Sequence, residues 1–296
     1  MDLLDGLLQL ARVDARLDAH CDLAASWALA VPAAGQHEMP FHVLLQGHAV
    51  VRLPGQPELV LGPGDVLIVV GGDAHRLEGS AFADGTLLCG RFLLPVAPAQ
   101  LLGSLLPRAL RVSSTASPGR VPLASVLELV RLESEAPGSG SAALLRHLCA
   151  ALLALCLRAN WSDGEVVPGL VALARHPRLA ELALAIIQRP AAAWALDDMA
   201  QRAHWSRSSL IRAFQAAAGI SPAAFLLRVR MAEACRQLLE GNGSVDAVGE
   251  AVGYASAAAF QRAFKREMGL TPAEWRLAPR VAEAVALPRR MRLTAA

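Results

Sequence analysis

The amino-acid sequence predicts an α+β protein of two domains, in which a small β-barrel is followed by an all-α domain that binds a polyanion. Three observations support this prediction. A twenty-residue segment occurs twice near the C-terminus, short apolar runs separated by Gly and Pro fill the N-terminal third, and basic residues gather in the C-terminal half. At 296 residues, the chain is long enough to bury two separate cores.

The repeated segment reads SRSSLIRAFQAAAGISPAAF from Ser206 and SAAAFQRAFKREMGLTPAEW from Ser256, an offset of 50 residues (256 − 206). A fixed offset between similar segments indicates a duplicated supersecondary unit. Each copy begins with a serine suited to cap a helix, continues with helical spacing of apolar residues, and ends at Gly219 or Gly269. Because Ser-Pro or Thr-Pro follows soon after each glycine, we expect a further helix after each copy.

Charge is divided unevenly along the chain. From Arg178 onward, 16 Arg and Lys stand against 10 Asp and Glu (net +6), whereas the first 177 residues carry 12 against 16 (net −4). A basic half beside an acidic one favours a polyanionic partner. Five cysteines without a tight framework, and no signal-peptide pattern, indicate a cytoplasmic protein. No apolar run reaches the roughly 18 residues of a membrane span, so no membrane partner is expected.

Short apolar runs such as FHVLLQG and DVLIVVGG, punctuated by Gly and Pro, predict closely spaced strands of a β-barrel or sandwich before residue 95. The stretch PGDVLIVVGGDAHRL contains a turn at residues 63–65, a second turn at residues 71–73, and then His75. It resembles the second sequence motif of the cupin family, and FHVLLQG resembles the strand that closes the first motif. The resemblance implies a cupin-like sensor barrel over residues 1–95, whose interior can hold a small molecule.

Four residues of this barrel are expected to meet in its interior: Cys21, His42, His75 and Cys89. Alternate residues of a strand face the same side, so His42 shares the inward side with Leu44. A thiol beside a histidine is a candidate redox centre. Metal-binding cupins supply a His-x-His pair and a Glu, which this sequence lacks, but His42, His75 and Cys89 are candidate ligands of a transition metal. The alternative is that these are ordinary core residues.

Residues 96–160 contain two helical patterns separated by PGSGS, which predict an antiparallel helical hairpin. The hairpin has more apolar surface than a monomer of this size needs. We therefore expect a homodimer, with packing of the hairpin on the barrel as the alternative. Residues 161–177 are expected to form a linker, and residues 281–296 a C-terminal tail.

The run over residues 178–280 resembles the DNA-binding domain of the AraC/XylS family of transcription regulators. The matching stretches are WSRSSLIRAF, the G-x-S-P that follows it, SVDAVGEAVGY and AFQRAFKREMG. The resemblance covers about 100 residues and implies two helix-turn-helix units joined by a long helix. It also implies double-stranded DNA and RNA polymerase as partners. A cupin-like domain before the DNA-binding domain is the common arrangement in that family.

The outward side chains of the two recognition helices are the candidate DNA contacts. Arg212 and Arg262 suit bidentate hydrogen bonds to guanine. By family position, the full set of base readers is Ser208, Ile211, Arg212, Ala258, Gln261 and Arg262. The side chains better placed for phosphates are Arg207, Lys265 and Arg266. Because the second copy begins with three alanines, we expect the first copy to supply most of the base discrimination.

The sequence therefore predicts a sequence-specific DNA-binding transcription regulator rather than an enzyme. A small molecule or an oxidant, sensed in the cupin-like domain, would control it. Two alternatives stay open. One is a metal-dependent cupin enzyme fused to a DNA-binding domain, and the other is an architectural DNA-binding protein that needs no ligand.

Overall fold

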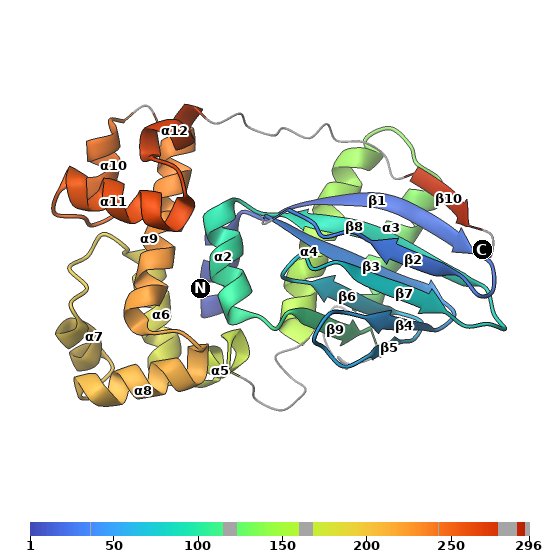
Figure 1. The fold of residues 1–296 in the computed structure, drawn as a ribbon, viewed down its shortest axis with the longest axis horizontal. Helices are drawn as coiled ribbons and strands as arrows, with labels where there is room; N and C mark the ends of the chain where they lie inside the picture. The colour runs from blue at the N-terminus through green and yellow to red at the C-terminus, as the bar shows by residue number, and fades with distance from the viewer. Residues whose placement is uncertain (36, 115–122, 160–167, 242, 278–288, 294–296) are drawn as a thin grey trace. The chain divides into compact units, whose positions relative to one another are not determined.

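The computed structural model describes residues 1–35, 37–114, 123–159, 168–241, 243–277 and 289–293. The chain divides into two compact units, each assembled from separate stretches of sequence (Figure 1). Unit 1 comprises Met1–Arg12, Leu94–Leu106 and Val166–Ala282. Unit 2 comprises Val13–Leu93, Pro107–Glu165 and Glu283–Ala296. This division differs from the expected boundary at residue 95, because two N-terminal stretches group with the C-terminal helices.

Unit 2 is built on two β-sheets (Figure 1). The first has the order β10-β1-β8-β3-β6-β9, and its strands are β1 (Asp14–Leu23), β3 (Glu38–Gln46), β6 (Asp65–Val69), β8 (Gly85–Leu93), β9 (Ala109–Ser113) and β10 (Arg289–Leu293). The second has the order β2-β7-β4-β5, and its strands are β2 (Ala28–Val31), β4 (Ala49–Arg52), β5 (Leu59–Leu61) and β7 (His75–Gly79). All neighbouring strands are antiparallel except β1 and β10, which run parallel.

The described strands form two separate sheets, so the closed barrel expected from the sequence is corrected to a two-sheet arrangement. A sandwich and a barrel bury the same alternating residues, so the strand pattern alone does not distinguish them. Residues from both sheets, among them Cys21, Leu44 and Leu77, share one buried core. A further strand, β9, lies beyond the point where the strand pattern was expected to end, because Leu110 and Val112 alternate inward.

The predicted helical hairpin is present in unit 2 as α3 (Leu123–Glu135) and α4 (Ser141–Ala159). The two helices pack on each other, and α4 packs on β1 and β8. Among the described residues, α4 is the one single helix with the length and apolar composition of a membrane span, although only 33% of its most apolar window is buried. Helix α4 therefore covers the first sheet, and part of its apolar surface stays exposed.

Unit 1 is helical throughout its described residues (Figure 1). Its N-terminal helices are α1 (Leu3–Ala11) and α2 (Val96–Leu105). Its C-terminal helices are α5 (Leu170–Arg175), α6 (Pro177–Gln188), α7 (Leu196–Arg202), α8 (Arg207–Ala218), α9 (Pro222–Glu240), α10 (Val245–Ala251), α11 (Ala257–Met268) and α12 (Pro272–Leu277). Helix α1 packs on α6, and α2 packs along α9. The long helix α9 is therefore the centre of this unit.

Two connecting segments lie partly outside the described residues. Of the expected linker 161–177, residues 161–167 are not described, and residues 170–175 form the short helix α5. Of the expected tail 281–296, only β10 is described. The register of β10 places Met291 beside Cys21 on the edge of the first sheet.

Candidate nucleic-acid interface and thiol site

The repeat appears in unit 1 as two helix-turn-helix units, α7–α8 and α10–α11. Helix α11 follows α8 at an offset of 50 residues (257 − 207), whereas α10 follows α7 at an offset of 49 (245 − 196). The second turn is therefore one residue longer than the first. His204 has a left-handed backbone in the first turn (φ 53°), and Gly253 has one in the second (φ 91°).

The two recognition helices begin and end as the sequence predicts. Ser206 and Ser256 cap α8 and α11 by accepting backbone N–H groups at their side-chain oxygens. Gly219 and Gly269 end these helices in the left-handed conformation. All nine candidate DNA-contacting residues are exposed: Arg207, Ser208, Ile211, Arg212, Ala258, Gln261, Arg262, Lys265 and Arg266.

The basic side chains of this set differ in their surroundings. In the part of the chain that the structure describes, Arg212 and Arg262 make no hydrogen bond or ion pair, so their guanidinium groups are available to a partner. Arg207 is engaged instead by Asp197 of α7 through two hydrogen bonds. Arg266 pairs with its neighbour Glu267 at 2.9 Å. A phosphate contact by Arg207 therefore requires the ion pair with Asp197 to open.

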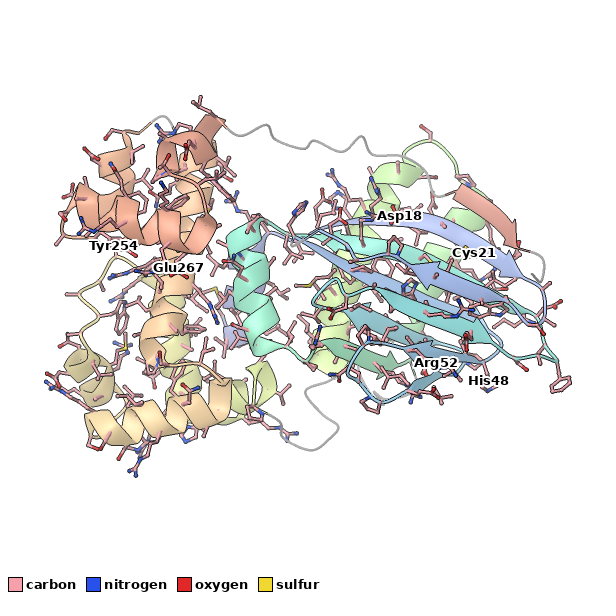
Figure 2. All side chains as sticks on the ribbon, in the orientation of Figure 1. Asp18, Cys21, His48, Arg52, Tyr254 and Glu267 are labelled. Carbon is pink, nitrogen blue, oxygen red and sulfur yellow. The ribbon has the colours of Figure 1, made fainter. Side chains whose placement is uncertain are left out.

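Arg230 on α9 contacts both helix-turn-helix units, a role that sequence reasoning missed. Its Nε donates to the Pro190 carbonyl at 2.9 Å, and Nη2 donates to the Ala192 carbonyl at 3.1 Å, both just before α7. Its guanidinium carbon also lies 5.6 Å from the ring centre of Tyr254 in the second turn (Figure 2). One side chain thus joins the first helix-turn-helix unit to the second.

The length of α9 suits a protein that reads two windows of DNA. Its 19 residues span about 28 Å at 1.5 Å per residue. Successive major-groove windows on one face of DNA lie roughly 34 Å apart. Helix α9 packs against α8 on one side of the repeat and against α10 and α12 on the other. The two recognition helices are therefore held by one rigid element of suitable length.

The four candidate sensor residues come together in unit 2. Cys21 on β1 and Cys89 on β8 are diagonal neighbours on adjacent strands, and each thiol shifts the pKa of the other. His42 Nδ1 on β3 lies 3.2 Å from Cys89 Sγ, and His42 Nε2 lies 2.7 Å from His75 Nε2 on β7. The thiols and His42 belong to one sheet and His75 to the other, so the cluster bridges the two sheets. Leu44, which shares the inward side with His42, lies in the same core.

The hydrogen-bond partners determine which nitrogen carries each proton. His75 Nδ1 lies 2.8 Å from the Asp73 carbonyl, which is an acceptor alone, so Nδ1 donates and Nε2 accepts. His42 must then donate from Nε2 to His75, and its Nδ1 becomes an acceptor for the Cys89 S–H. A continuous path of hydrogen bonds therefore runs from the Cys89 thiol to the backbone beside β7.

The histidines are held neutral by burial. Burial and, to a lesser extent, the nearby His75 lower the pKa of His42 to about 3. Burial also lowers the pKa of His75. Interaction between the two thiols lowers the pKa of Cys21, whereas that interaction and burial raise the pKa of Cys89. At neutral pH, both imidazoles are therefore neutral.

A cavity of about 340 Å³ reaches this cluster, with His42 and Cys89 in its lining. Three charged residues also line it. Arg91 Nε lies 2.8 Å from Asp18 Oδ2, and its Nη1 lies 3.0 Å from Glu38 Oε2. Cys89 is half-buried, whereas Cys21 is fully buried. A small reagent in this cavity therefore meets Cys89 before Cys21.

The donor set does not fit a metal ion in this arrangement. Among the residues that the structure describes, no group of three His, Cys, Asp or Glu could hold one. Two nitrogen ligands of a tetrahedral zinc stand roughly 3.3 Å apart, from zinc–nitrogen distances of about 2.0–2.1 Å. The 2.7 Å between His42 and His75 is instead a hydrogen-bond distance.

Sequence reasoning missed a second buried contact of β1. His20 is 1% exposed, and its Nδ1 lies 3.0 Å from Ser134 Oγ on α3. The pattern of a polar residue before Cys21 gave no sign of burial, because the covering helix comes from more than a hundred residues further along the chain. β1 thus contacts the thiol cluster on one side and the helical hairpin on the other.

Comparisons with known proteins identify the family of each part of the chain. A family described as "Helix-turn-helix domain" matches residues 199–278, and a family described as "Cupin" matches residues 2–162, more than half of the chain. The chain is 29% identical over 276 residues to the RCS-specific HTH-type transcriptional activator RclR of Escherichia coli, covering 93% of this chain and 97% of the relative. It is 28% identical over 302 residues to the HTH-type transcriptional regulator MtrA of Neisseria gonorrhoeae, with 93% and 98% covered.

Among solved structures, the DNA-binding domain of AdpA, a global transcriptional factor in complex with a target DNA, is 30% identical. That match covers 33% of this chain and 89% of the AdpA chain, with a TM-score of 0.33. The two family matches and the relatives together account for the fold of each part of the chain. The protein belongs to the AraC family of transcription regulators, with an N-terminal cupin domain and a C-terminal DNA-binding domain of the helix-turn-helix type.

Proposed function

We propose that this DNA-binding transcription regulator is switched by two-electron oxidation of Cys89 and Cys21 to a disulfide. The observation that carries the proposal is the pair of cysteines at diagonal positions on adjacent strands, with Cys89 at the cavity and its Sγ 3.2 Å from His42 Nδ1. The name of the relative RclR specifies RCS as its signal. A chemical signal read by thiols is consistent with that relationship.

The reaction needs an oxidant of the form X–OH, where X is a halogen or a hydroxyl group. Cys89 Sγ attacks X, His42 Nδ1 accepts the thiol proton, and the leaving hydroxide takes up that proton as water. Cys21 Sγ then attacks Cys89 Sγ, the S–S bond forms, and X⁻ leaves with the Cys21 proton passing to solvent. The two thiols lose two electrons, which the oxidant gains.

The test compares Cys21→Ser and Cys89→Ser with Cys149→Ser, which removes a buried thiol of α4. Each purified full-length protein is treated with hypochlorous acid or hydrogen peroxide, and thiol content and DNA affinity are measured. Cys21→Ser and Cys89→Ser should bind DNA as the reduced parent does and lose the response to oxidant, whereas Cys149→Ser should keep it. A normal response in both of the first two variants would refute the proposal.

The cavity supports a second candidate signal, a small-molecule effector held beside Arg91 and His42. This hypothesis predicts that Cys21→Ser and Cys89→Ser still respond to the effector, since neither substitution closes the cavity. The enzyme reading has less support, because the donor set does not fit a metal and the relatives are named as transcriptional regulators. We therefore propose that the protein has no catalytic activity of its own.

We also propose that the α3–α4 hairpin joins two copies of the chain. Leu129, Leu132 and Leu144 are 51%, 48% and 46% exposed, and Leu129 and Leu132 lie three residues apart, on the same side of α3. Helix α3 carries three Glu and one Arg (net −2), and α4 carries two Arg (net +2). In a two-fold interface, the acidic helix of one copy faces the basic helix of the other, so the charges are complementary as well.

The cell compartment and the partners follow from this role. A regulator with reduced thiols that binds chromosomal DNA would work in the cytoplasm. RNA polymerase would be its partner at the promoter. Detection of polymerase in a complex with the protein on a target promoter would test the second point.

A further inference from the structure

The two cysteine-bearing strands lead directly into two helices. Helix α1 ends at Ala11, and β1, which carries Cys21, begins at Asp14. Strand β8, which carries Cys89, ends at Leu93, and α2 begins at Val96. Two residues therefore separate strand from helix at each junction. A connection of two residues can extend very little, so a movement of the strand is passed on to the helix.

Both helices are built into the core around α9, in unit 1. Ala97 of α2 lies in a buried cluster with Met231 and Cys235 of α9, and Leu10 of α1 packs against the same cluster. A side chain at Gly6 of α1 would meet Leu184 of α6 at 3.1 Å, so α1 lies close to that helix. These contacts join α1 and α2 to the helix that carries both DNA-reading units.

An ion pair fixes the end of α1 nearest to β1. Arg12, the first residue of the junction, pairs with Glu240 at the C-terminal end of α9. Arg236 also bonds Glu240, at 3.0 Å. Exposed ion pairs add little stability, but this one fixes the end of α1 against the last turn of α9.

Disulfide formation requires β1 and β8 to move relative to each other. Cys21 is paired with Leu87, and Cys89 is paired with Ala19, so the two cysteines are diagonal neighbours. Diagonal residues lie about 7–8 Å apart, whereas a disulfide needs Cα atoms at about 4.4–6.8 Å. The register of β1 and β8 shifts between Leu17 and Ala19, so the ladder of hydrogen bonds is already disrupted next to the cysteines.

We propose that α1 and α2 are the output elements of the thiol switch, and that oxidation changes DNA binding by moving them on α9. The inference rests on the proposed redox function and names the route of its signal. A shift of β1 along β8 moves the ends of the two strands in opposite directions. Both α1 and α2 pack on α9. A displacement of one against the other therefore changes the relative orientation of the two helix-turn-helix units that α9 carries.

The test inserts Gly-Gly at the junctions of the full chain, once between Arg12 and Val13 and once between Leu93 and Leu94. Flexible insertions break mechanical transmission and cost little stability. The matched control inserts Gly-Gly after Gly55, at a turn whose surroundings are open. Disulfide formation is followed by thiol content, and DNA affinity is measured in the reduced and oxidised forms.

In the parent and the control, oxidation should change DNA affinity at least about fivefold, the range of ordinary allosteric coupling. In the junction variants, the disulfide should form as before, while the change in affinity falls below about twofold. A full response in both junction variants would overturn the inference but leave the redox function intact. No disulfide in the parent would instead refute the redox function.

A second measurement needs no insertion. Hydrogen exchange of α9 amides in the parent protein should change on oxidation, and it should not change in Cys21→Ser. If oxidation alters DNA affinity while α9 exchanges at the same rate in both forms, the signal does not pass through α9. That result would overturn the inference even if an insertion variant fails to fold.

Discussion

His42 Nε2 and His75 Nε2 lie 2.7 Å apart, one on each sheet of the cupin domain. This contact joins the sheets through two imidazoles, one of which also accepts the Cys89 thiol proton. Replacing either ring changes both the cohesion of the sheets and the proton path of the thiol. The pair therefore gives measurable consequences for stability and for reactivity.

The first prediction concerns pH and stability. The pKa of His42 is about 3 in the folded protein and 6.5 in the unfolded chain. Between these values the unfolded chain binds a proton that the folded protein does not, so the free energy of unfolding falls as pH decreases. The slope from His42 is about 1 kcal/mol per pH unit. Urea unfolding of the reduced protein at pH 7, 6, 5 and 4 measures it.

The matched control for this prediction is His48→Gln, which removes an exposed imidazole from the same domain. His42→Gln should flatten the dependence of unfolding free energy on pH, and His48→Gln should leave it unchanged. Equal slopes in His42→Gln and the parent would show that His42 is protonated in the folded state. The oxidation rate of Cys89 should also fall in His42→Gln, because the thiol loses its proton acceptor.

The second prediction concerns base reading. Arg212→Ala should weaken binding to the cognate site by about 1–3 kcal/mol and relax the preference at one base pair. Arg262→Ala should do the same at a second base pair, with a smaller effect. Selection from a randomised DNA pool measures both. Arg202→Ala on α7 removes the same charge outside the recognition helices, so it should leave the preferred sequence unaltered.

A third prediction follows from the strained turn of the first unit. His204 is exposed and has φ 53°, where the second turn has Gly253. His204→Gly should raise the free energy of unfolding by about 0.5–1 kcal/mol, because a left-handed backbone costs a residue with Cβ more than it costs glycine. His204→Ala keeps the Cβ and should give no gain. If the two variants are equally stable, the turn is not strained.

The fourth prediction tests the homodimer. Leu132→Glu places a charge on an exposed apolar side of α3, so it should not disturb the fold of the monomer. Sedimentation should show a dimer for the parent and a shift of at least about tenfold in the dissociation constant for Leu132→Glu. Phe82→Glu is the comparison, since Phe82 is 97% exposed in a loop of the same domain. A dimer unaffected by Leu132→Glu would place the interface elsewhere.

Local chemistry made much of the fold predictable. Ser206 and Gly219 cap the two ends of α8 as expected, because a helix cap depends on its own residue and on the few residues next to it. The inward side of His42 was predictable as well, since strand residues alternate. The order of the hydrogen bonds was not, because it depends on the Asp73 carbonyl.

Other structural features depend on contacts with distant segments of the chain, which the local sequence pattern does not identify. The apolar residues of α1 form a buried face, but nothing local tells whether such a face meets a sheet or a helix. The same holds for Arg230, whose acceptors lie about 40 residues earlier in the chain. The separation into two sheets was missed because strand spacing alone fits a barrel too.

The place of α1 has a consequence for how the chain folds as it is made. Arg12 and its partner Glu240 are separated by 228 residues. At about 5–20 residues per second, the ribosome needs roughly 11–46 s to supply that partner. During this time the apolar face of α1, with Leu3, Leu4 and Leu7, has no α6 or α9 to cover it. The first helix to be synthesised is thus among the last to fold, and a nascent-chain chaperone is the natural protector of its leucines.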